Sequence, residues 1–88
     1  MKSGWRTLRE LDESAGTPKG TAFRAFKRIE PTLREPLDYR LLRSGEAASQ
    51  IAELRGSDRI YDSSRNVVLL SPALSDRLLE SLRVENTG

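Results

Sequence analysis

Two helix starts lie ten residues apart near the N-terminus, and a glycine stands between them. Thr7 and Glu10 have the spacing of a capping box, in which each side chain accepts a hydrogen bond from the other residue's backbone N–H. Gly16 can take the positive φ angle at which a helix ends. The Thr-Pro pair at residues 17–18 then suits the N-cap and first position of a new helix. The pattern predicts a helix of about nine residues, a tight turn at the glycine and a second helix over residues 18–29.

The middle of the chain mixes strands with a helix. Pro31 and Pro36 interrupt helix formation, and residues 39–42 and 67–70 have the composition of short strands. Residues 46–55 place apolar side chains at helical spacing, which predicts a helix, with a partly ordered insertion as the alternative. We expect the two strands to pair in a small antiparallel sheet, so the predicted fold class is α+β.

A last helix is predicted to begin at Ser71 and Pro72, which again suit an N-cap and first helical position. Its leucines repeat every fourth residue, at Leu74, Leu78 and Leu82. We expect this stripe to close the core of the monomer. The alternative is that the stripe forms the seam of a homodimer.

Length and composition are those of one small domain. Eighty-eight residues give room for a single core over residues 1–88, with flexible ends expected at residues 1–6 and 84–88. The chain has no cysteine and no histidine, so we expect neither a disulfide nor a structural metal site. A Gly-rich phosphate loop and a nucleophile elbow are also missing, and we expect no enzymatic activity and no cofactor.

Nothing in the sequence suggests insertion into a membrane. The longest apolar run, residues 67–70, is too short to span a bilayer, and the N-terminus has no apolar signal core. We therefore expect a cytoplasmic protein without membrane contact.

Basic residues are concentrated in the first half of the chain. Residues 1–44 carry ten Lys or Arg against six Asp or Glu, whereas the remaining residues carry five against seven. In the second predicted helix, an apolar stripe that should face the core lies opposite a basic face. Phe23 lies at the edge of the apolar stripe, and we expect it in the core as well. A basic helix that projects from a tight helical hairpin predicts contact with DNA phosphates.

The stretch AGTPKGTAFRAFKRI, at residues 15–29, resembles the turn and recognition helix of bacterial helix-turn-helix regulators. Over most of its length the chain resembles the winged domains of MerR-type regulators and phage excisionases. This resemblance implies a small winged helix-turn-helix with a short antiparallel β-sheet, in which a hairpin wing and a further helix follow the helix-turn-helix. It also implies sequence-specific binding of double-stranded DNA by a transcriptional regulator or by a phage or plasmid accessory factor, with residues 18–29 in the major groove.

The resemblance also assigns contacts to individual residues. The start of the second helix is assigned to base edges and nearby phosphates, and Lys27 and Arg28 are assigned to backbone phosphates. Arg24 is the best candidate for reading a guanine, because arginine can bind that base through two hydrogen bonds. Arg40, on the first strand, and Arg65, in a polar turn over residues 62–65, would touch DNA from the wing, with plain solvent exposure as the alternative. The predicted DNA-binding residues are Thr17, Lys19, Gly20, Thr21, Arg24, Lys27, Arg28, Arg40 and Arg65.

Asp12 stands where these regulators usually have a small residue, typically alanine, against the crossing helix. If Asp12 faces that crossing, its replacement by alanine is expected to be neutral or mildly stabilising. The alternative is that Asp12 makes a specific hydrogen bond or cap, in which case the replacement costs more than about 1 kcal/mol and the alignment is misplaced.

The alternative function is a protein-interaction module, for instance an antitoxin-like or adaptor domain, without catalytic activity. The two functions differ in their dependence on salt. Phosphate contacts make affinity fall steeply as salt rises, whereas an apolar protein interface changes little.

Overall fold

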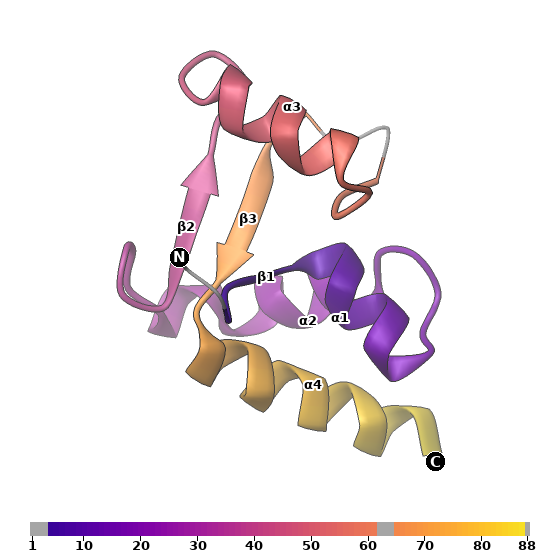
Figure 1. Ribbon diagram of the computed structural model, residues 1–88. Coiled ribbons are helices and arrows are strands. Elements are labelled where there is room, and N and C mark those ends of the chain that lie inside the picture. The colour runs from indigo at the N-terminus through magenta and orange to yellow at the C-terminus, as the bar shows by residue number, and fades with distance from the viewer. Residues whose placement is uncertain (1–3, 62–64, 88) are drawn as a thin grey trace.

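The computed structural model describes residues 4–61 and 65–87 (Figure 1). Within these residues there are four α-helices, a short 3₁₀ helix and a three-stranded antiparallel sheet, so the predicted α+β class is confirmed. In chain order the elements are β1 (Arg6–Thr7), α1 (Leu8–Ala15), α2 (Thr21–Ile29), η1 (Glu30–Thr32), β2 (Tyr39–Leu42), α3 (Ala48–Gly56), β3 (Val67–Leu70) and α4 (Pro72–Thr87).

The predicted signals at both ends of α1 are confirmed. The Thr7 hydroxyl accepts a hydrogen bond from the Glu10 backbone N–H at 3.2 Å, and the Glu10 carboxylate accepts one from the Thr7 N–H at 2.9 Å. Gly16 ends the helix with a φ angle of 71°, in the left-handed region that glycine adopts without strain. The local sequence therefore fixes both the start and the end of this helix.

The predicted start of α2 is wrong by three residues. The helix begins at Thr21, and its N-cap position is Gly20, with a φ angle of 93°. Residues 17–20 form a turn instead, closed by a hydrogen bond of 3.1 Å from the Thr21 N–H to the Pro18 carbonyl. Because Gly20 is in a left-handed conformation, the helix cannot extend back through it to Pro18.

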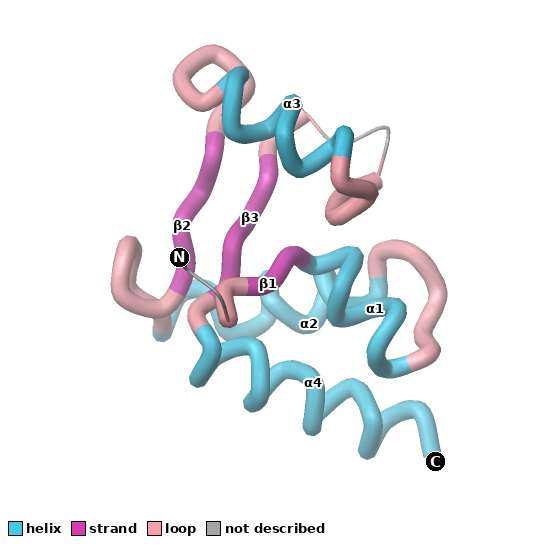
Figure 2. Tube along the Cα trace, viewed as in Figure 1, coloured by secondary structure: helices cyan, strands magenta, loops and turns pink. Residues whose placement is uncertain are grey.

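The sheet has the strand order β1-β3-β2 (Figure 2). The predicted pairing of residues 39–42 with residues 67–70 is confirmed, with Tyr39 opposite Leu70. Strand β1 was not predicted: Arg6 also pairs with Leu70, on the other edge of β3. At the C-terminus, residues 84–87, which were expected to be flexible, continue α4 as helix.

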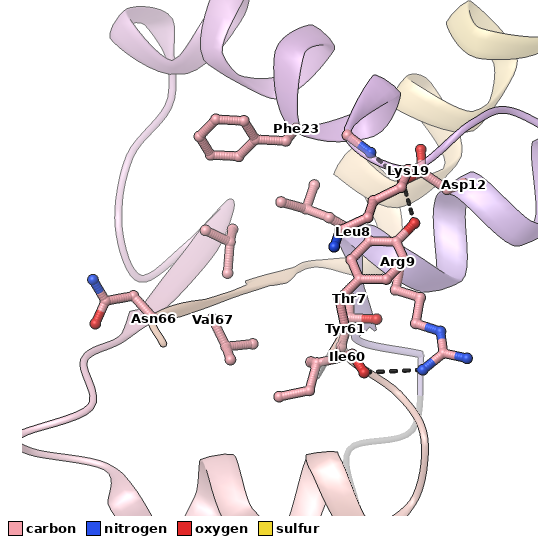
Figure 3. A pocket seen from close by; sticks show the side chains of 12 residues that line it. Thr7, Leu8, Arg9, Asp12, Lys19, Phe23, Ile60, Tyr61, Asn66 and Val67 are labelled. Carbon is pink, nitrogen blue, oxygen red and sulfur yellow. Dashed lines mark hydrogen bonds between the residues drawn. The ribbon is translucent and has the colours of Figure 1, made fainter. Parts of the chain in front are cut away.

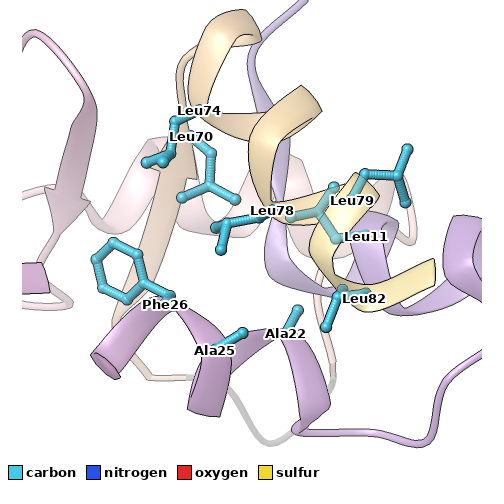
Figure 4. Close-up of a cluster of buried hydrophobic side chains, with 9 residues drawn as sticks. All are labelled: Leu11, Ala22, Ala25, Phe26, Leu70, Leu74, Leu78, Leu79 and Leu82. Carbon is cyan, nitrogen blue, oxygen red and sulfur yellow. The ribbon is translucent and has the colours of Figure 1, made fainter. Parts of the chain in front are cut away.

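The main core lies where α1, α2 and α4 gather around one end of the sheet (Figures 1 and 4). Phe26 of α2 meets Tyr39 of β2 edge to face, with 5.2 Å between the ring centroids. Leu74, Leu78 and Leu82 are 1%, 3% and 0% exposed, so the stripe closes the monomer core as expected. The buried members of this cluster are Leu11, Ala22, Ala25, Phe26, Leu70, Leu74, Leu78, Leu79 and Leu82.

A second, smaller core lies at the opposite end of the sheet, where α3 joins β2 to β3 (Figure 1). Ile51 is the buried residue of α3, and it packs with Leu42, Ile60 and Val67. The predicted helix at residues 46–55 is therefore present, shifted to Ala48–Gly56. Among the described residues, no helix is long and apolar enough to cross a membrane.

Candidate nucleic-acid interface

The carboxylate of Asp12 holds the N-terminus of α2 against α1. Asp12 is 1% exposed, and its Oδ1 atom accepts hydrogen bonds from the Ala22 N–H at 2.8 Å and the Thr17 hydroxyl at 3.1 Å. Its Oδ2 atom accepts one from the Gly20 N–H at 3.1 Å. These bonds satisfy backbone donors that the first turn of a helix leaves free. The structure thus has the alternative arrangement, in which Asp12 is a cap: it holds the start of α2 from the preceding helix.

Tyr61 extends this network to the segment that follows α3. Its hydroxyl donates to Asp12 Oδ2 at 2.7 Å (Figure 3). The charged groups of Arg9 and Lys19 lie 5.6 Å and 5.0 Å from the centroid of its ring, within the range of cation–π attraction. Burial and the bond to Asp12 raise the pKa of Tyr61 above its usual value, because they disfavour the charged phenolate.

Arg59 fixes the same segment to the start of α1. Its guanidinium donates to both Glu10 carboxylate oxygens at 3.0 Å and to the Trp5 carbonyl at 2.8 Å, while its own carbonyl accepts from the Thr7 hydroxyl. Burial alone would raise the pKa of Glu10, but the hydrogen bonds from Arg59 and Thr7 outweigh it and lower that pKa. The Arg9 guanidinium donates to the Ile60 carbonyl at 2.9 Å. Residues 59–61 and α1 are thus joined by polar contacts.

The exposed face of α2 carries the predicted basic residues. Arg24, Lys27 and Arg28 are exposed, opposite the buried Ala22, Ala25 and Phe26. The Arg24 guanidinium lies over the N-terminal turn of the helix: one of its nitrogens is 3.5 Å from the Thr21 hydroxyl, and another lies beside Gly20.

The two basic residues in the last turn of α2 have different neighbours: Lys27 lies beside an acidic residue and Arg28 beside another arginine. The Lys27 ammonium lies 2.6 Å from the Glu30 carboxylate, and the Lys27 side chain is still 53% exposed. Arg28 borders a shallow groove between α2 and α4 that is also lined by Arg77. The basic surface therefore extends from α2 onto α4, although α4 was not predicted to contribute to it.

The remaining predicted contacts are divided between two faces. Lys19 and Gly20 lie at the start of α2, and Thr17 is partly buried beside Asp12. Because Tyr39 points toward Phe26 of α2 and side chains alternate along a strand, Arg40 points to the opposite face of the sheet. There it lines a pocket with Trp5.

Arg65 is exposed and lies two residues before β3. The rest of the predicted polar turn, residues 62–64, lies outside the described residues. Of the two predicted wing contacts, Arg65 therefore precedes β3, and Arg40 lies on the sheet face opposite that of Tyr39.

The expectation that Phe23 belongs to the core is wrong. Its exposed fraction is 47%, against 2% for Phe26 on the same helix. Phe23 borders a pocket of about 280 Å³ between α2 and β3, whose lining includes Leu8, Val67 and Val68 (Figure 3). An exposed aromatic residue therefore adjoins the basic face.

Comparison with protein-family models, with curated proteins and with solved structures found no match to this chain. Among the described residues, no group of three or more carboxylate side chains is placed to hold a metal ion.

We expect Asp12→Ala to lower the free energy of unfolding by more than about 2 kcal/mol, because it leaves two backbone donors and two hydroxyls without their acceptor. Chemical denaturation measures this loss. Glu13→Ala is the matched control: it removes a carboxylate from the same helix, but one whose ion pair with Arg9 is exposed. The control should cost less than about 0.5 kcal/mol. A neutral Asp12→Ala would show that the network does not stabilise the fold.

The raised pKa of Tyr61 predicts a loss of stability in alkaline solution. The unfolded chain releases the Tyr61 proton near pH 10, whereas the folded chain holds it, so the stabilisation is complete below that pH and decreases above it. Denaturant melts from about pH 8 to about pH 11 measure the slope. Tyr61→Phe should flatten the slope, while Tyr39→Phe should leave the Tyr61 contribution in place. An equal slope in wild type and Tyr61→Phe would contradict this assignment.

Proposed function

We propose that this chain is a sequence-specific binding domain for double-stranded DNA, acting as a transcriptional regulator or as a phage or plasmid accessory factor. In this proposal it is a small winged helix-turn-helix: α1 and α2 are the helix-turn-helix, α2 enters the major groove, and the β2–β3 hairpin, with α3 at its end, is the wing. The observation that carries the proposal is the exposed basic face of α2, held in place by the buried Asp12.

The size of α2 suits a major groove. A helix with its side chains is about 10–12 Å across, and the groove of B-DNA is about 12 Å wide. The residues at the start of a recognition helix meet the base edges. Lys19 and Arg24 lie at that end of α2, and no acidic residue occurs from residue 17 to residue 29.

The fixed position of α2 is the second observation that supports the proposed DNA binding. An element that is ordered before the DNA arrives favours base readout, since ordering it on binding costs free energy. The hydrogen bonds from the Gly20 and Ala22 N–H groups to Asp12 hold the first turn of α2 in one position. The basic side chains therefore project from a rigid element.

A comparison of Arg24→Ala with Lys27→Ala tests this proposal, because both remove one positive charge from the exposed face of α2. On a duplex selected from a random library, loss of Arg24 should cost about 1–3 kcal/mol, with much less effect on unrelated DNA. Loss of Lys27 should weaken both kinds of DNA by a similar factor and make the slope of log affinity against log salt shallower by about one unit. Fluorescence anisotropy over a salt series measures all of these values.

Arg83→Ala is the matched control, since it removes an exposed arginine from α4, outside the predicted DNA-binding residues. It should leave the affinities and the salt slope unchanged. Equal losses on both duplexes for Arg24→Ala would reduce α2 to a non-specific anchor. No loss from Arg24→Ala or Lys27→Ala would overturn the proposal and favour a protein-interaction module.

A further inference from the structure

Phe23 is the feature of α2 that phosphate binding does not explain. It lies in the first turn of the helix, directly before Arg24, and nearly half of its side chain is exposed. Exposing a large aromatic side chain on a small domain forgoes the stabilisation that its burial would give. Phe26, one turn further along, is almost fully buried. Phe23 is therefore an exposed aromatic residue that lies next to the basic residues of α2 and borders a partly apolar pocket.

The surroundings of Phe23 combine apolar and cationic groups. On one side is the pocket to which Val67 and Val68 of β3 contribute, and which also includes Lys19 (Figure 3). Arg24, the next residue of the helix, is also exposed. A partner at this position must present an apolar group close to negative charge.

In the major groove of DNA, one group is both apolar and close to negative charge. The edges of the bases carry hydrogen-bond donors and acceptors, and the one apolar group among them is the C5-methyl group of thymine. The phosphates on either side of the groove supply the negative charge. With α2 in the groove, an aromatic side chain on its first turn has this methyl group as its apolar partner.

We propose that Phe23 is a specificity-determining residue that contacts the C5-methyl group of a thymine. This inference rests on the proposed DNA-binding function and adds a second base to the one assigned to Arg24. Phe23 and Arg24 are consecutive residues of one helix, so the thymine is expected in the same part of the binding site as the guanine that Arg24 reads.

Deletion of single methyl groups tests this contact. Each thymine of the selected duplex is replaced in turn by deoxyuridine, which pairs identically but lacks the methyl group. Replacement of one thymine should lower the affinity of the wild type about fourfold, the change expected when one buried methyl group is lost. In Phe23→Ala the same replacement should have no effect at that position. Circular dichroism checks that the variant is folded.

Leu37→Ala is the matched control, because Leu37 is also an exposed apolar residue, at 71%, but lies in the loop before β2. This variant should keep the fourfold effect. If Phe23→Ala also keeps it, or if no thymine methyl matters to the wild type, this inference is overturned while the proposed function stands. If the wild type binds no duplex, both are overturned.

Discussion

The buried carboxylate of Asp12 is the interaction on which the arrangement of the first two helices depends. Within the described residues it accepts four hydrogen bonds, from two backbone N–H groups and from the hydroxyls of Thr17 and Tyr61. A carboxylate has about four such acceptor sites, so burial leaves none of its capacity unused. An unpaired charge in the same place would be strongly destabilising. The carboxylate and the start of α2 therefore require each other: α2 has no side-chain cap of its own, and Asp12 supplies one.

Local signals predicted what local interactions determine. The capping box at Thr7, the glycine at residue 16 and the leucine stripe of α4 act over a few residues, and the structure has all of them. The predicted start of α2 was wrong although Thr-Pro is a good local helix start. The carboxylate of Asp12, five residues before Thr17, binds the hydroxyl that would have capped the helix. Gly20 was the one residue in the sequence that indicated a later start, because glycine readily adopts the left-handed conformation that ends or precedes a helix. The contact from Tyr61 to Asp12 spans 49 residues, and nothing in the sequence points to it.

The direction in which the side chains of Phe23 and Arg40 point depends on neighbouring residues that the sequence does not identify. Residues 39–42 have two consecutive leucines, so the alternation that normally assigns the faces of a strand is ambiguous. The contact between Tyr39 and Phe26 shows that Tyr39 lies on the sheet face toward α2, so Arg40 lies on the opposite face. For Phe23, the helical periodicity placed it at the edge of the apolar stripe. The separation between α2 and β3 leaves it beside an open pocket instead of in the core.

The two apolar cores are separate clusters, and polar contacts join the parts of the chain around them. α1 belongs to the main core, whereas residues 59–61 follow the helix that closes the smaller one. Between them, Arg59 binds Glu10, Arg9 binds the Ile60 carbonyl, and Tyr61 binds Asp12. Hydrogen bonds depend on direction more than apolar contacts do, so this junction fixes an orientation as well as a distance. The position of α2, which Asp12 holds, is therefore sensitive to Tyr61, a residue 49 positions from Asp12 in the sequence and outside the basic face of α2.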